Sequence, residues 1–285
     1  MSTHPYTVLD VFTDTRLAGN GLAVVHEADG VSDEVMLAFA KETRLVETTF
    51  VQTSEAADYR NRIWTPAEEL PFAGHPSLGT AVAVALERGE DKAEYRQQTH
   101  AGIQAVRVKR DGDRAYASIL QEPAQFGEEV DPAAILAAVG LVPEDAHPTL
   151  RPQLVSTGLA TLVAPVASAD AVRRARSDAA AVKALADGTF NLYLCAIDGD
   201  VARARSFMSE LADEDPATGS AAGPLMAYAN VRLGARRLEV TQGVEMGRPS
   251  LLLAEMEDGR PRVGGDVVVL VTGTLRLPGG APRSM

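Results

Sequence analysis

Two helical segments without a polar face constrain the fold of this chain more than any other feature. Residues 76–88 and 221–233 carry small or apolar side chains on every side of a predicted helix, through its early and middle positions. A helix of this composition is normally buried all round, so other elements must enclose it. We therefore expect two hydrophobic cores, each built around one central helix.

The two helices lie about half a chain apart, which indicates an internal repeat. Ser220 lies 220 − 75 = 145 positions after His75, and Gly158 lies 158 − 19 = 139 positions after Gly19. Short runs rich in β-branched and aromatic residues, separated by turn residues, surround both helices and predict strands. The expected fold is α+β, with two similar domains, each a strongly curved and mostly antiparallel sheet wrapped round its helix.

The length of the chain agrees with two domains. Its 285 residues are long for one domain and comfortable for two. We place the domains at residues 1–122 and 123–285, and residues 123–131 are predicted to be a connector. The last strands of the second domain are also candidates for packing back on the first.

The charge balance argues against polyanionic partners. The chain carries 27 Lys and Arg against 39 Asp and Glu, a formal net charge of −12. Duplex binding requires a basic stripe, whereas the basic cluster at residues 173–176 is followed by Asp178 and predicts a solvated helix face. We therefore expect neither nucleic acid nor an acidic membrane as a partner, although local donors still allow an anionic small molecule.

Cysteine usage and hydropathy indicate a cytoplasmic protein. The single cysteine, Cys195, cannot form an internal disulfide, and its apolar surroundings predict a place in a core. No segment approaches the roughly 18 continuous apolar residues of a membrane span. Residues 1–14 lack the basic start and apolar stretch of a signal peptide.

The starts of the two central helices are candidate binding sites for an anion. The first turn of a helix has unpaired N–H groups and the positive end of the helix dipole. Small residues at these positions let a ligand approach the backbone closely. The candidate substrate-binding residues are Gly74, Ser77, Thr218, Gly219 and Ser220. The alternative is that Gly, Pro and Ser are simply favoured where helices begin.

Three titratable residues and one asparagine are the further candidates. Glu47 is flanked by apolar residues, and partial desolvation of a carboxylate favours an acid/base role near neutral pH. His75 and Asp215 lie beside the two helix starts, and Asn20 lies in a glycine-rich turn where it is able to bind a ligand. Each has a structural alternative: a solvated strand end, a neutral hydrogen-bonding partner, or a turn cap.

The sequence lacks the motifs of several large enzyme classes. There is no HExxH or CxxC pattern, and His75 has no ligand neighbour at helical spacing, so no metal is expected. The GxSxG elbow, the GxxxxGK[ST] loop and a GxGxxG turn after a strand are also absent. These absences argue against hydrolase, nucleotide-dependent and NAD-dependent functions.

Five ordered motifs make the chain resemble the phenazine-biosynthesis-protein (PhzF-like) family. They lie at residues 12–25, 47–51, 62–81, 215–221 and 242–250, and the resemblance extends from about residue 6 to about residue 275. It implies two domains of the diaminopimelate-epimerase type, a homodimer, and an isomerase without a cofactor that acts on a small anionic carboxylic or amino acid.

The resemblance also implies roles for individual residues. Glu47 matches the catalytic glutamate that moves a proton between carbons, and His75, Asp215 and Ser220 match positions that line the substrate site. Gly74 and Gly219 match backbone donors. The inter-domain cleft of the family would hold all of them. Related epimerases use two cysteines beside the central helices, and this chain has none at those positions.

Several alternatives stay open at the level of sequence. Residues 16–21 and 77–79 depart from the common family pattern near the expected site. A binding protein that has lost catalysis and a lyase that begins with the same proton abstraction share the same residues. Arg248 suits either a carboxylate-binding or a structural role, and Trp64 suits either the core or the wall of the site. The substrate itself is not predicted.

Overall fold

The computed structural model describes residues 1–186, 188–208 and 214–278, which form two compact units. Unit 1 comprises Met1–Ile119 together with the segment that begins at Gly264, and unit 2 comprises Leu120–Val263. Both units combine a sheet with helices, so the protein is a mixed α/β, sheet-rich structure. The first boundary therefore lies at 119/120. Residues 264–278 belong to unit 1 because the last strand pairs with the first.

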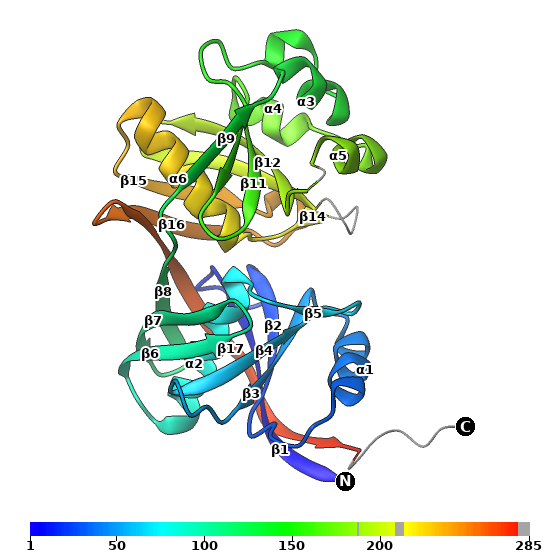
Figure 1. Cartoon of the computed structure of the whole chain (residues 1–285), viewed down its shortest axis with the longest axis vertical. Coiled ribbons are helices and arrows are strands. Elements are labelled where there is room, and N and C mark those ends of the chain that lie inside the picture. The colour runs from blue at the N-terminus through cyan, green and yellow to red at the C-terminus, as the bar shows by residue number, and fades with distance from the viewer. Residues whose placement is uncertain (187, 209–213, 279–285) are drawn as a thin grey trace. The chain divides into compact units, whose positions relative to one another are not determined.

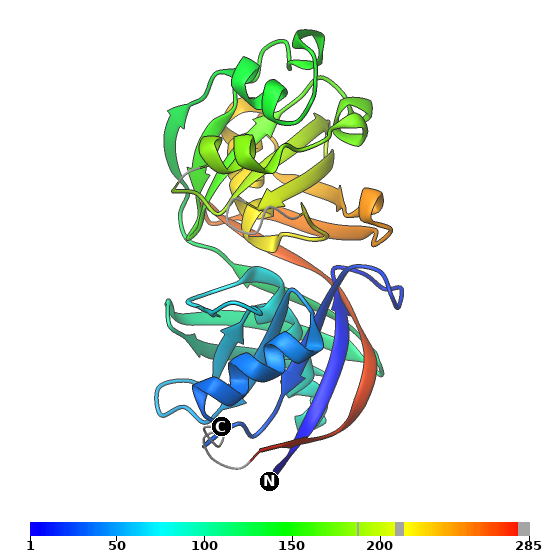
Figure 2. The ribbon, with the colours of Figure 1, turned by 90° about the vertical axis from the view of Figure 1, so that its right-hand side faces the viewer.

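The strands of unit 1 surround one buried helix (Figure 1). Its strands are β1 (Ser2–Val11), β2 (Asn20–Val25), β3 (Glu47–Gln52), β4 (Tyr59–Trp64), β5 (Glu69–Leu70), β6 (Lys92–Thr99), β7 (Gly102–Asp111), β8 (Arg114–Leu120) and most of β17 (Arg260–Leu277). The central helix is α2 (Gly74–Arg88), which contacts six of these strands. Helix α1 (Asp33–Thr43) lies across the other face of the sheet (Figure 2).

Unit 2 repeats this plan. Its strands are β9 (Gln125–Glu129), β10 (Gln153–Ser156), β11 (Ala160–Pro165), β12 (Asn191–Asp198), β13 (Val201–Met208), β14 (Glu214–Asp215), β15 (Arg237–Gln242) and β16 (Ser250–Glu257). Its central helix is α6 (Gly219–Leu233). Helices α3 (Pro132–Ala138), α4 (Ala169–Arg174) and α5 (Ala179–Leu185) pack on the outer face, where they share a core with β11, β12 and β13. The expected connector at 123–131 contains β9, which pairs with β10.

The pairing pattern shows that the two units are copies of one topology. In unit 1, β1/β2 is antiparallel, β2/β3 parallel, β3/β4 antiparallel, β4/β6 parallel and β6/β7 antiparallel. In unit 2 the same sequence of orientations joins β10/β11, β11/β12, β12/β13, β13/β15 and β15/β16. The half-chain offset seen in the sequence therefore reflects a repeated sheet.

Close packing explains why the central helices are built from small residues. All residues of α2 from Gly74 to Ala85 are buried. A Cβ atom on Gly79 would lie 2.6 Å from a methyl group of Leu22 and 2.7 Å from one of Leu9. The sheet thus approaches the helix backbone more closely than a larger side chain allows.

The same structural motif fastens the hairpin before each central helix. Arg62 on β4 donates two hydrogen bonds to Glu69 on β5 and lies over the Trp64 ring, 5.5 Å from its centroid. In unit 2, Arg205 donates two hydrogen bonds to Glu214 and lies 5.0 Å from the centroid of Phe207. The offsets are 205 − 62 = 143 and 214 − 69 = 145. We call each set an arginine clamp.

Candidate active site

Three of the candidate residues meet at the start of α2. His75 is the second residue of the helix, Glu47 is the first residue of β3, and Asn20 is the first residue of β2. All three are buried. The Nε2 atom of His75 lies 3.3 Å from Oε2 of Glu47, and its Nδ1 atom lies 3.1 Å from Nδ2 of Asn20. The imidazole therefore lies between a carboxylate and an amide.

The alternation of side chains along β3 directs Glu47 toward α2. Glu47 and Thr49 point to the same face because successive residues of a strand point to opposite faces. The Thr49 hydroxyl lies 2.8 Å from the Thr80 hydroxyl in the middle of α2. Glu47, two residues earlier, accordingly reaches the first turn of the helix and His75. The Glu47 carboxylate therefore lies between its own strand and the first turn of the helix.

The His75 imidazole is neutral. Burial lowers its pKa to about 3, because the charged form loses its hydration in the protein interior. A neutral imidazole has one nitrogen that donates and one that accepts a hydrogen bond. At neutral pH this histidine therefore brings no positive charge to Glu47.

The first turn of α2 keeps backbone donors available. The position before the helix is Ala73, whose side chain makes no capping hydrogen bond. The Ser77 hydroxyl donates a 2.7 Å hydrogen bond back to the Ala73 carbonyl. Ser77 thus fixes the turn that presents the amides of Gly74 and His75. Such an uncapped turn is suited to negative charge.

A second group forms at the start of α6 in unit 2. The Thr218 hydroxyl donates a 2.5 Å hydrogen bond to Oδ2 of Asp215. Gly219 and Ser220, the first residues of α6, are both buried. The candidate residues of this half of the sequence therefore share one loop and one helix start.

Two glutamines organise this second group, and neither role was predicted. Nε2 of Gln242 donates to the Asp215 carbonyl at 2.7 Å, while its Oε1 accepts from the Thr218 amide at 3.2 Å. Nε2 of Gln121 donates to the Gly219 carbonyl at 2.8 Å. Gln242 begins the motif at 242–250, which is the only signal in the sequence that points to it. Gln121 has no such signal, because its contact joins residues 98 positions apart.

Trp64, Cys195 and the backbone of Arg248 lie in structural surroundings. Trp64 is buried in the core shared with α1. The Arg248 amide donates to the Gly243 carbonyl at 3.0 Å, which closes a turn of the backbone. Cys195 is fully buried, and burial raises the pKa of its thiol to about 12. A buried thiol of this kind is inert as a nucleophile.

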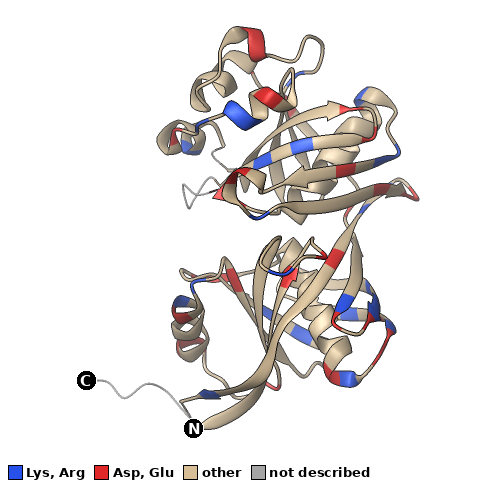
Figure 3. Cartoon of the chain, turned by 180° about the vertical axis from the view of Figure 1, so that it is seen from behind, with Lys and Arg blue, Asp and Glu red and all other residues tan. Residues whose placement is uncertain are grey.

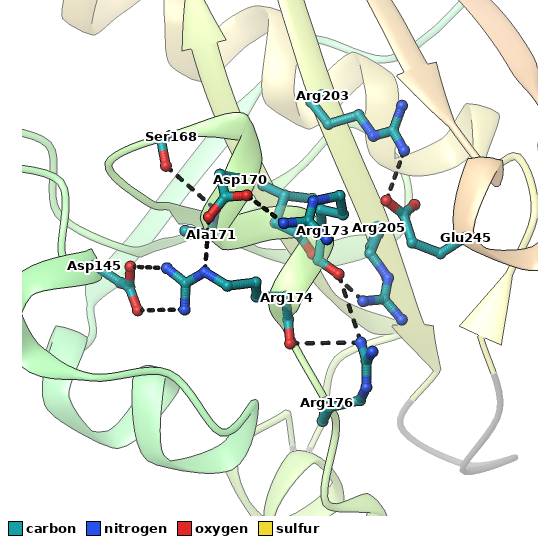
Figure 4. Close-up of polar contacts among 11 residues, drawn as sticks. Asp145, Ser168, Asp170, Ala171, Arg173, Arg174, Arg176, Arg203, Arg205 and Glu245 are labelled. Atoms are coloured by element: carbon teal, nitrogen blue, oxygen red, sulfur yellow. Dashed lines mark hydrogen bonds and ion pairs between the residues drawn. The ribbon is translucent and has the colours of Figure 1, made fainter.

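Two of the three arginines in the basic cluster at residues 173–176 are paired with acidic residues (Figure 4). Arg173 and Arg174 both bond to Asp170, at 2.5 and 2.8 Å, and Arg174 also bonds to Asp145 at 2.6 Å. Arg176 donates to backbone carbonyls of its own segment. Basic and acidic residues are both scattered over the ribbon of each unit (Figure 3).

Other possible sites lie apart from the candidate residues. A cavity of about 570 Å³ in unit 2 is lined by Ser168, Asp198 and Arg203 among others, and the Arg203 guanidinium is paired with Glu245 at 2.6 Å. Within the described residues, no group of three His, Cys, Asp or Glu side chains is placed to hold a metal ion. No helix in the same part of the chain is long and apolar enough to cross a membrane.

Comparison with known proteins identifies a family and several relatives. The model of the family described as phenazine biosynthesis-like protein matches residues 9–274. An uncharacterized isomerase of Mesorhizobium japonicum is 36% identical over 96% of this chain and 99% of its own length. The trans-2,3-dihydro-3-hydroxyanthranilate isomerase of Pseudomonas aeruginosa is 35% identical, over 91% of this chain and 93% of its own.

A solved structure supports the same assignment. A predicted epimerase from Pseudomonas aeruginosa is 37% identical and has a TM-score of 0.85. The match covers 95% of this chain and 99% of that one. The two chains therefore share one fold from end to end.

Proposed function

Since this chain belongs to the phenazine biosynthesis-like protein family, whose curated relatives are named isomerases, we propose that it moves a carbon-bound proton of a small carboxylic or amino acid without a cofactor. Glu47 is the proposed acid/base. The observation that supports this role is the buried Glu47 carboxylate held 3.3 Å from a neutral imidazole.

The proposed reaction is an isomerisation in which Glu47 carries the proton. The Glu47 carboxylate removes a proton from a carbon beside an electron-withdrawing group, and the electron pair of the broken C–H bond delocalises over the substrate. The resulting carboxylic acid returns the proton to another carbon of the same molecule. Atoms and charge balance without any other reactant. The first-turn amides of α2 stabilise the anion as it forms.

We propose that the group in unit 2 binds the same substrate. The backbone amides of Gly219 and Ser220 are suited to bind a carboxylate of the substrate. Asp215, which accepts a hydrogen bond from the Thr218 hydroxyl, positions a proton on the substrate. Thr218→Val removes the hydroxyl that holds Asp215 with little change in volume. We expect this variant to raise KM or lower kcat while unfolding at the wild-type urea concentration. Unchanged kinetics would remove this group from the proposal.

Solvent exchange tests the proposed role of Glu47. The substrate of the Pseudomonas aeruginosa relative is the first candidate, followed by a panel of cyclic and acyclic amino acids. In D2O, NMR should show deuterium entering substrate carbon with wild type and not with Glu47→Gln. Glu245→Gln is the matched control, since Glu245 is a half-buried, ion-paired glutamate of unit 2. Equal turnover in wild type and Glu47→Gln would refute the role.

The same spectra separate the alternatives. A lyase would release water and form a product with an additional double bond, whereas an isomerase leaves the composition of the substrate unchanged. Binding without exchange or turnover across the whole panel would favour a protein that has lost catalysis.

We further propose three properties from the family resemblance. Each unit is a diaminopimelate-epimerase-type domain, the chain forms a homodimer, and it acts in the cytoplasm. Light scattering of the purified protein tests the second property, and cell fractionation tests the third. A monomer at micromolar concentration, or a protein found outside the cytoplasm, would contradict them.

A further inference from the structure

The two nitrogens of His75 face chemically different groups. Nδ1 lies 3.1 Å from the Asn20 amide nitrogen, and Nε2 lies 3.3 Å from a Glu47 carboxylate oxygen. An amide NH2 group only donates hydrogen bonds, and a carboxylate only accepts them. With the NH2 group of Asn20 toward the ring, Nδ1 accepts, and the one proton of the neutral ring resides on Nε2.

We propose that Asn20 is a positioning residue that fixes His75 as the neutral Nε2–H tautomer. In this form the ring carries its proton on the side that faces Glu47 and has no lone pair there with which to accept one. His75 then orients the Glu47 carboxylate and does not carry the transferred proton itself. This role in turnover rests on the proposed function, whereas the tautomer is a property of the resting protein.

The backbone fixes the Asn20 side chain in place. Asn20 is fully buried and pairs with Val11 on the neighbouring strand β1. Gly19, just before it, has a φ of +64°, and a Cβ atom there would lie 2.4 Å from the Val11 carbonyl oxygen. Only glycine fits this approach without strain. The turn therefore delivers the side-chain amide of Asn20 to the ring.

The parallel pairing of β2 with β3 brings Asn20 and Glu47 to the same side of His75's helix. Leu22 on β2 is in register with Glu47 on β3, so Asn20 and Glu47 come from adjacent strand starts. His75 on α2 lies against both strands. The donor, the ring and the acceptor are thus supplied by three elements of unit 1 that share one core.

The arrangement also opposes the charged form of the ring. An imidazolium carries a second proton on Nδ1, where it would face the NH2 group of Asn20, donor against donor. Burial acts in the same direction, because it holds the pKa of His75 near 3. Both effects keep the ring from taking up a second proton. The proton that is removed from the substrate therefore stays on Glu47.

Nitrogen NMR of the resting protein tests the proposal. The protein is labelled with 15N-histidine, and the His75 signals among the five histidines are assigned by their loss in His75→Gln. We expect Nδ1 to resonate in the unprotonated range and Nε2 in the protonated range, unchanged from pH 8 to pH 5. A protonated Nδ1, or a mixture of tautomers, would overturn the proposal.

Variants of Asn20 test the cause. Asn20→Asp replaces the donor by an acceptor, so the proton should move to Nδ1 and the ring should titrate at higher pH than in wild type. Asn20→Ala, which adds no buried charge, should give a mixture of tautomers. The matched control is Asn61→Ala, another buried asparagine of unit 1, on β4. A His75 spectrum that is unchanged in Asn20→Ala would refute the proposal.

The outcomes separate the tautomer from the proposed function. The spectra are recorded without substrate, so the tautomer is established or refuted even if Glu47→Gln retains turnover. Conversely, loss of exchange in Glu47→Gln supports the acid/base role even if Nδ1 proves to be protonated. If Asn20→Asp does not fold, the wild-type and Asn20→Ala spectra decide the proposal.

Discussion

A substitution at Gly223 tests how the start of α6 is held in place. A Cβ atom on Gly223 would lie 1.8 Å from Oε1 of Gln121 and 3.1 Å from the Thr157 hydroxyl oxygen. The Gln121 side chain is itself fixed at both ends. It donates to the Gly219 carbonyl at 2.8 Å and accepts from Thr157 at 2.5 Å. Gly223→Ala must therefore displace Gln121 and break both hydrogen bonds.

The cost follows from the groups that lose their partners. Two lost hydrogen bonds, with the buried Gly219 carbonyl and Thr157 hydroxyl left behind, cost about 2–4 kcal/mol in total. Replacing glycine by alanine inside a helix returns up to about 1 kcal/mol. The following Pro224 opposes that gain, because proline disfavours helical backbone at a preceding residue that has a Cβ atom. We expect a net destabilisation of about 2–3 kcal/mol.

A double-mutant cycle measured by urea denaturation isolates this effect. Gln121→Ala removes the obstructing side chain and should by itself cost about 2–4 kcal/mol. In that background, Gly223→Ala should change the free energy of unfolding by less than about 1 kcal/mol. If Gly223→Ala has the same cost with and without the Gln121 side chain, the clash is elsewhere and the reasoning is wrong.

Two further predictions concern charged groups. Arg62→Met leaves the partly buried Glu69 carboxylate with His100 as a remaining partner and should cost about 2–3 kcal/mol, less than the loss of a partner from a fully buried pair. Arg62→Met/Glu69→Leu should restore most of this stability. Urea denaturation measures both, and a double variant no more stable than Arg62→Met would contradict the explanation. Burial lowers the pKa of His26 from 6.5 to about 4, so the unfolded chain binds this proton first as the pH falls. Stability from neutral His26 is complete above pH 6.5 and should fall by roughly 3 kcal/mol by pH 4. His26→Gln should flatten the measured stability over that range, and an unchanged slope would show that other groups dominate.

The sequence predicts those features that depend on local composition. The central helices follow from their small and apolar residues, and both begin within two residues of the expected positions. Glu47 was expected to be partly desolvated because of its apolar neighbours, and it is buried.

Features that depend on long-range pairing could not be predicted. The contact between His75 and Glu47 requires α2 to pack on β3, and nothing in either segment specifies the other. Residues 123–131 were expected to be a connector, although β9 lies among them. All five residues of β9 are exposed. A strand without a buried face lacks the alternation of apolar and polar residues that identifies strands in a sequence.

The repeated topology has a stereochemical consequence. The position equivalent to Glu47 in unit 2, 191 − 47 = 144 residues later, is Asn191, the first residue of β12. Its side chain is an amide bonded to Ser206 at 2.6 Å, and an amide cannot act as a general base. The two units thus share one topology, but only unit 1 has a carboxylate at this position. Under the proposed function, in which Glu47 is the acid/base, the proton is removed and returned on one side of the substrate, so we expect a suprafacial transfer.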